Sequence, residues 1–165
     1  MEVIAYTDGS YKEFPDLGGF YSGAAILLIN GEISSQVLTQ VGNHPANLPL
    51  RNVAGEISAV LMACEYCMNT LNMKQGDTLT IMHDYVGIAN WCKKAGEKDF
   101  WRAKKPLTIQ YRDYMNGRVK TRFNVNFQHV KGHAKNAFNN AVDEVAGKAM
   151  MQHVEILRNQ RNKDA

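Results

Sequence analysis

The sequence contains no unbroken apolar run of the roughly 18 residues that a membrane-spanning helix needs. Its N-terminus passes from Met1 straight into an alternating strand pattern, without the basic stretch and apolar segment of a secretion signal. By pattern, neither a membrane span nor a signal peptide is indicated. We therefore expect a cytoplasmic protein.

Cysteine is scarce, with three residues in the chain, and the odd number argues against a disulfide framework. Cys64 and Cys67 have the spacing of a metal or redox pair. They fall inside a helical pattern, however, and no second Cys or His pair completes a zinc site. We expect these thiols to lie in the core.

The chain has 165 residues, of which 45% are hydrophobic. This length supports one full core and is too short for two ordinary domains. We expect residues 1–165 to form a single domain that acts as a monomer without an obligate protein partner.

Net charge is modest at +3, but it is unevenly distributed. The basic segment, residues 93–105, holds +4, so the rest of the chain sums to −1. Together with Trp101, its cations predict a surface for a polyanion, because lysines neutralise phosphates and aromatic faces pack on sugars or bases. The alternative is a solvated loop anchored by buried tryptophans. The candidate substrate contacts here are Lys94, Trp101, Lys104 and Lys105.

Alternating and periodic patterns predict both strands and helices. Residues 3–7 read as a strand ending at Asp8, and two further strands, 23–29 and 33–41, flank the hairpin signal Asn30-Gly31. Asn52 is placed to cap a helix that reaches residue 71. Beyond it we expect a buried strand over 78–82, helices over 85–94 and 106–115, a strand over 123–128 and a terminal helix over 142–157.

This succession predicts an α/β fold with a five-stranded mixed sheet in the order 3-2-1-4-5. A strand that follows a crossover helix returns parallel, so the first and fourth strands become parallel neighbours. Asp8 and Asp84 then emerge together at the carboxyl ends of their strands. Two carboxylates this close repel each other, and a divalent cation removes that penalty. Oxygen ligands from Asp and Glu are those that Mg²⁺ or Mn²⁺ selects.

Four blocks carry a family resemblance. In chain order they are Tyr6-Thr7-Asp8-Gly9-Ser10, Asn52-Val53-Ala54-Gly55-Glu56, Asp84 with Gly87-Ile88 and Trp91, and Val130-Lys131-Gly132-His133-Ala134 with Asn139 and Asp143-Glu144. Each block is weak alone, but their order and spacing over residues 3–150 resemble ribonuclease HI. The resemblance implies the three-layer RNase H-like fold, with helices on both faces of the sheet and a terminal helix that extends to residue 160.

Roles follow from the resemblance, position by position. The metal-binding carboxylates would be Asp8, Glu56, Asp84 and Asp143, and His133 would assist proton transfer or product departure. Contacts to the RNA strand, partly through its 2′-hydroxyl groups, are implied for Gly9, Ser10 and Asn52. Asn139 would lie near the catalytic centre.

Some positions depart from the family pattern. Arg51 stands where many bacterial members have a threonine in a phosphate pocket, so a charge would rebuild that contact. His83 replaces the small hydroxyl residue often found before the third carboxylate, and the segment 13–19 looks longer than in compact members. The basic segment would be an abbreviated, still cationic handle. Neither His83 nor His129 receives a role from the sequence.

The resemblance implies an endoribonuclease that hydrolyses the RNA strand of RNA/DNA hybrid duplexes with two Mg²⁺ ions, for which Mn²⁺ would substitute. Products would carry 5′-phosphate and 3′-hydroxyl ends. Two alternatives remain open: a hybrid-binding module without turnover, and another nuclease or strand-transfer enzyme of the same fold. Against the first, all four carboxylates are present. Against the second, Asp8 is followed by Gly9-Ser10, whereas exonucleases of this fold usually carry Asp-x-Glu.

Overall fold

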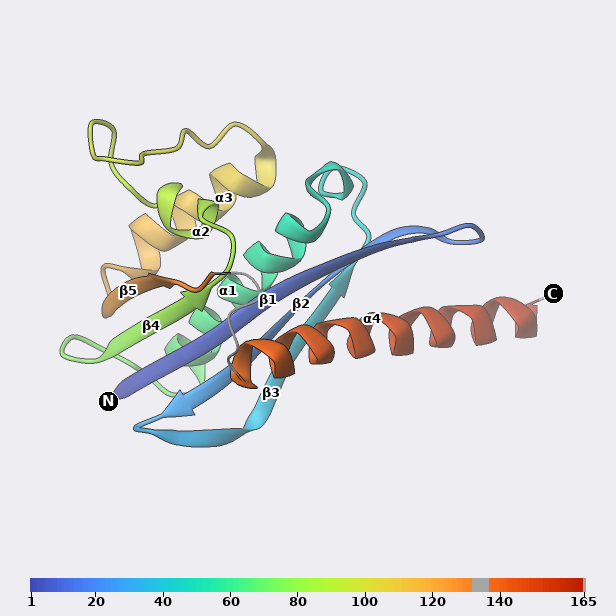
Figure 1. Cartoon of the computed structure of the whole chain (residues 1–165), viewed down its shortest axis with the longest axis horizontal. Coiled ribbons are helices and arrows are strands. Elements are labelled where there is room, and N and C mark those ends of the chain that lie inside the picture. Colours follow the sequence, from blue (N-terminus) through green and yellow to red (C-terminus); the bar gives the residue numbers. More distant parts are fainter. Residues whose placement is uncertain (132–136, 165) are drawn as a thin grey trace.

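The computed structural model describes residues 1–131 and 137–164, and Figure 1 shows a five-stranded sheet between helices. The strand order β3-β2-β1-β4-β5 confirms the predicted topology. Antiparallel pairing joins β1 to β2 and β2 to β3, whereas β4 lies parallel to both β1 and β5. The bounds are Glu2–Phe14 for β1, Gly18–Ile29 for β2, Glu32–Gly42 for β3, Thr78–His83 for β4 and Asn124–His129 for β5.

Helices cover both faces of the sheet, as predicted. On one face, α1 (Asn52–Asn69) and α3 (Pro106–Tyr114) bury the main core cluster. On the other, α4 (Ala137–Asp164) packs on a second cluster. Successive strand residues point to opposite faces, so Ala24 of β2 belongs to the α4 cluster and Ala25 to the α1 cluster. The short helices are η1 (Leu48–Leu50), α2 (Gly87–Asn90) and the π-helix η2 (Met115–Val119).

The first strand is longer than the sequence predicted. It does not end at Asp8, because β2 keeps pairing with it as far as Phe14 opposite Gly18. The parallel ladder with β4, in contrast, stops at Tyr6 opposite Met82. Asp8 therefore lies inside a strand but just beyond the end of its pairing with β4. On that side of β1, β4 no longer covers the strand.

Two local expectations about helices were wrong. Asn52 does not cap α1, because Arg51 occupies the N-cap position and makes no side-chain cap bond. The helix expected over residues 85–94 is the single turn α2. There the chain turns back, with Gly96 at φ +92° and the Trp101 backbone N–H bonded to Asn90 O at 3.2 Å.

The additional length of the β1–β2 hairpin rests on the last turns of α4. Phe14 and Phe20 of the hairpin form a third cluster with Met150 and Val154 of the helix. At the hairpin turn, Nε and Nη2 of Arg158 donate to the two carboxylate oxygens of Asp16, each at 3.0 Å. Arg161 adds a bond from Nη1 to Asp16 O at 3.0 Å, so two arginines late in α4 hold the hairpin turn against the helix.

All three cysteines, Cys64, Cys67 and Cys92, are free and buried, which confirms the prediction of core thiols. Burial raises the pKa of each thiol, so these groups stay protonated and unreactive near neutral pH. Within residues 1–131 and 137–164, no helix combines the length and apolarity that crossing a membrane requires.

Glycines allow α1 to lie close against the sheet. A methyl group on Gly9 would collide with the backbone of α1 at Asn52 O and Glu56 N. A methyl group on Gly55 would collide with Ser22 O, and one on Gly23 would lie 2.8 Å from Ala59 N. Packing therefore requires a glycine at position 9, independently of the RNA contact that the resemblance implies there. This close crossing brings the start of α1, and Glu56 with it, beside β1.

We expect Gly55→Ala to destabilise the fold by about 1–3 kcal/mol, because the added methyl forces α1 away from β2. The shift would also move Glu56 away from Asp8, so Mg²⁺-dependent activity should fall more than the loss of folded protein explains. Urea unfolding and activity at a temperature where the variant is folded measure the two effects.

Gly147→Ala in α4 is the matched control, because nothing lies within 4 Å of the added methyl. It should be neutral or slightly stabilising, as alanine favours a helix over glycine. Equal stability of the Gly55 and Gly147 variants would contradict the proposed close crossing.

Candidate active site

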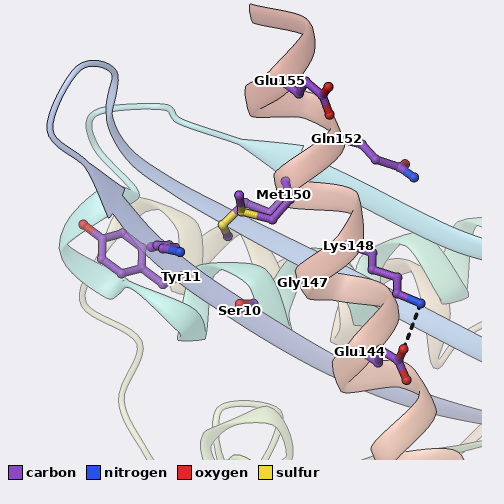
Figure 2. A pocket seen from close by; sticks show the side chains of 10 residues that line it. Ser10, Tyr11, Glu144, Gly147, Lys148, Met150, Gln152 and Glu155 are labelled. Atoms are coloured by element: carbon purple, nitrogen blue, oxygen red, sulfur yellow. Dashed lines mark ion pairs between the residues drawn. The ribbon is translucent and has the colours of Figure 1, made fainter. Parts of the chain in front are cut away.

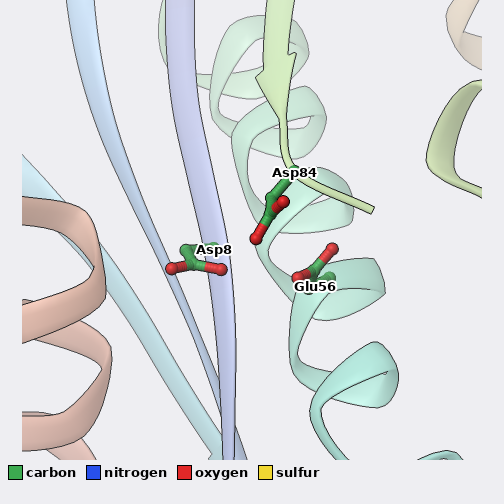
Figure 3. Close-up of side chains that lie close together, drawn as sticks. All are labelled: Asp8, Glu56 and Asp84. Carbon is green, nitrogen blue, oxygen red and sulfur yellow. The ribbon is translucent and has the colours of Figure 1, made fainter. Parts of the chain in front are cut away.

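Three carboxylates from three elements meet at one point of the sheet edge (Figure 3). Asp8 comes from β1, Asp84 follows the end of β4, and Glu56 comes from α1. One ligand oxygen of each lies within 4.8 Å of the others. Glu56 is only 4% exposed, whereas Asp84 is exposed and Asp8 is half-buried. The structure thus brings together three of the four carboxylates that the sequence singled out.

Crowding and burial make this carboxylate triad costly to ionise. Burial, followed by the charges of Asp8 and Asp84, raises the pKa of Glu56 to about 8. The pKa of Asp8 is raised to about 7, mainly by burial, with contributions from Asp143 and Asp84; the Gly9 N–H, 2.9 Å from its Oδ1, acts in the opposite direction. A divalent cation would relieve both penalties. All-oxygen ligands of this kind suit Mg²⁺ or Mn²⁺.

The fourth carboxylate, Asp143, approaches the triad from the α4 side. Its charge and its side chain both raise the pKa of Asp8, so the two carboxyl groups lie near each other. It does not belong to the group within 4.8 Å, and it is exposed on α4. Asn139 precedes it by one helical turn and therefore shares its face of α4. His133 lies outside the described residues.

The proposed RNA contacts lie close to the triad. Gly9 and Ser10 follow Asp8 on β1, and Asn52 is the first residue of α1, with its carbonyl facing Gly9. The guanidinium group of Arg51 lies 5.8 Å from the centre of the Tyr11 ring. This ring contact holds Arg51 at the start of α1, near the place where the sequence expected a phosphate contact.

A groove of about 480 Å³ opens between β1 and α4, lined in part by Ser10, Lys12, Glu144 and Lys148 (Figure 2). It adjoins the triad, because Ser10 lies two residues beyond Asp8 on β1 and Glu144 follows Asp143 on α4. Lys148 is paired with Glu144 at 2.8 Å. No sequence pattern pointed to Lys12 or Lys148, since only the packing of α4 along the hairpin places them beside the site.

In the basic segment, tryptophans anchor the loop and lysines face the solvent. Trp101 is half-buried. Its ring centroid lies 5.8 Å from that of Trp91 and 5.8 Å from that of Tyr85, and both ring pairs meet edge-to-face. Lys94, Lys104 and Lys105 are all exposed. A surface for a polyanion and a solvated loop anchored by tryptophans are therefore compatible interpretations of this segment. Tyr85 joins the segment to the triad, because its ring packs edge-on against Trp101 and its backbone N–H acts to lower the pKa of Glu56.

The RNase H family model matches residues 1–151. The chain belongs to the RNase H family. A ribonuclease H of Francisella philomiragia subsp. philomiragia is 29% identical in an alignment 162 positions long, and the match covers 91% of this chain and 91% of that relative. The range that the family model matches includes all four carboxylates of this RNase H family chain.

Solved structures show the same fold. LC11-RNase H1 in complex with an RNA/DNA hybrid is similar with a TM-score of 0.61 and 17% identity, over 90% of this chain and 99% of that one. The protease-reverse transcriptase of prototype foamy virus is similar with a TM-score of 0.62 and 19% identity over 88% of this chain. This chain covers 20% of the viral protein, so the RNase H fold forms a small part of it.

Proposed function

We propose that this chain is a ribonuclease H that cleaves the RNA strand of RNA/DNA hybrids, using two divalent ions, Mg²⁺ by preference with Mn²⁺ as a substitute. The observation that carries the proposal is the convergence of Asp8, Glu56 and Asp84 within 4.8 Å. Membership of the RNase H family supports the activity, and the hybrid bound to LC11-RNase H1 supports the substrate. Action as a cytoplasmic monomer stays a prediction.

In this proposal the side chains divide the work by position. Asp8, Glu56 and Asp84 hold the ions, and Asp143 completes the site from the α4 side, next to Asp8. When bound, the ions lower the pKa of the attacking water and stabilise the departing 3′-oxygen. That chemistry leaves 5′-phosphate and 3′-hydroxyl ends. Burial of Glu56 keeps bulk water from competing for its oxygens.

Digestion of a labelled RNA/DNA hybrid in Mg²⁺ and in Mn²⁺ tests the proposal, with duplex RNA, single-stranded RNA and duplex DNA as controls. We expect cleavage of the hybrid alone, in the RNA strand, with products that a ligase requiring 5′-phosphate ends accepts. Tight binding without turnover would favour the hybrid-binding module. Cleavage of duplex DNA would favour another nuclease of this fold.

The basic segment should contribute to substrate binding. Replacing Lys94, Lys104 and Lys105 together by glutamine should mainly raise KM, because the lysines are exposed to solvent and phosphate contacts release counterions. The slope of log affinity against log salt concentration should weaken by about 0.9 for each phosphate group that the variant no longer neutralises. KM measured over a series of salt concentrations gives both quantities.

The control is a triple variant with the same reduction of charge outside the segment, at Lys74, Arg118 and Lys163. It should keep the wild-type KM at low salt. If the variant of the basic segment also keeps it, the segment does not bind nucleic acid.

A further inference from the structure

The turn that carries Asp84 is held by two imidazole rings. The β4–β5 ladder ends at His83 opposite His129, where the Val130 N–H bonds His83 O at 2.7 Å. Beyond that point, Nε2 of His129 lies 2.7 Å from Asp84 O, and Nδ1 of His83 lies 2.9 Å from Tyr85 O. A carbonyl oxygen can only accept a hydrogen bond, so both ring nitrogens must be donors. The carbonyl groups of two successive peptide units, Asp84–Tyr85 and Tyr85–Val86, are therefore tied to side chains of β5 and β4.

The two rings are held differently. His83 is only 2% exposed, and its ring packs against those of Phe127 and His129, with centroids 6.1 Å and 5.8 Å away. Its Nε2 is buried and has no hydrogen-bond partner among the described residues. His129 is exposed on β5 at the edge of the sheet. His129 can thus be replaced without opening the core, whereas His83 cannot.

Asp84 is the member of the triad that most needs such support. Glu56 is buried within α1, and Asp8 lies in a strand that pairs on both sides as far as residue 6. Asp84 is exposed and stands outside regular secondary structure, immediately after β4. A freely rotating main chain would lose conformational freedom when its carboxylate binds an ion. A hydrogen bond already in place at the Asp84 carbonyl reduces that loss.

We propose that His129 is a positioning residue that holds Asp84 in its metal-binding arrangement through the Nε2–H bond to the Asp84 carbonyl. The inference rests on the proposed function, since it assigns Asp84 a metal. His129 does not touch the ion or the substrate. It raises metal affinity by ordering the ligand before the ion arrives, as outer-shell partners do.

The test compares His129→Ala with His129→Gln, because the glutamine amide nitrogen lies as many bonds from Cβ as Nε2 of histidine and can restore the donor. For the alanine variant we expect the Mg²⁺ concentration for half-maximal cleavage to rise about tenfold, the lower end of the usual range for outer-shell partners. The effect on kcat at saturating Mg²⁺ should be smaller. Affinity for Mn²⁺ without substrate, measured by calorimetry, should fall in parallel, and the glutamine variant should recover most of both losses.

His44→Ala is the matched control, since His44 is also an exposed imidazole with one backbone hydrogen bond, to Ala46 N, in the loop after β3. It should leave the Mg²⁺ requirement unchanged. The proposal is overturned if His129→Ala keeps wild-type affinity, or if His129→Gln is as defective as His129→Ala. Either result leaves the proposed function intact as long as the wild-type protein binds Mn²⁺ and cleaves hybrids only with a divalent ion. A wild-type protein that does neither would overturn both proposals.

Discussion

Replacing Asp8 by asparagine is expected to abolish Mg²⁺-dependent cleavage of an RNA/DNA hybrid while the protein stays folded. The change removes a charge from the centre of the triad, where one oxygen of Asp8 lies within 4.8 Å of those of Glu56 and Asp84, and where the charge of Asp143 is also felt. Loss of a direct ligand should exceed the roughly 10- to 100-fold cost of losing an outer-shell partner. Single-turnover cleavage of a labelled hybrid measures the effect, and circular dichroism checks the fold.

Asp113→Asn serves as the control for this experiment. Asp113 is an exposed carboxylate on α3 that pairs with Arg112, outside the triad. It should retain wild-type cleavage. An Asp8→Asn enzyme with near wild-type rates in Mg²⁺ would remove the basis for a metal site at these carboxylates.

Without metal, the protein should lose stability as the pH rises from about 6.5 to about 8. The pKa of Asp8 is raised to about 7 and that of Glu56 to about 8, so the folded state binds more protons than the unfolded chain in this range. The free energy of unfolding therefore falls as the pH rises, because both carboxyl groups must ionise inside the folded protein. Saturating Mg²⁺ should remove the loss, because it binds the ionised form. Thermal unfolding with and without Mg²⁺ measures this loss of stability. The unfolding temperature should fall by about 2–4 °C for each kcal/mol lost.

The Glu56→Gln variant separates this effect from other titrations. Glutamine keeps the length of the side chain and an acceptor oxygen near the Tyr85 backbone N–H, but it cannot ionise. The metal-free variant should be more stable than the wild-type protein at about pH 8 and should vary less with pH. His83 acts in the opposite direction below about pH 6.5, because burial lowers its pKa, and so the comparison begins there. If the metal-free wild-type protein were equally stable at both ends of this range, the triad would not be strained.

Patterns along the chain predicted the features of this protein that depend on near neighbours in sequence. Alternation and helical spacing identified the strands and the long helices, and the connections between them predicted the order β3-β2-β1-β4-β5. The parallel pairing of β1 with β4 then placed Asp8 and Asp84 at one edge from the sequence alone. Element ends were less predictable. The length of β1 depends on its partner β2, and α2 is short because its chain turns back toward Trp101.

The sequence by itself predicted the topology of the sheet and the pairing of Asp8 with Asp84, because both follow from residue type and local spacing. Glu56 and Asp143 entered through the resemblance to ribonuclease HI. Only the tertiary structure decided how close Glu56 comes to Asp8, since that distance depends on glycines of β1, β2 and α1 meeting in space. It alone revealed that His129 bonds the carbonyl of Asp84, 45 residues away in the chain. It also decided the raised pKa values of Asp8 and Glu56, because desolvation exists only once the chain has packed around a charge.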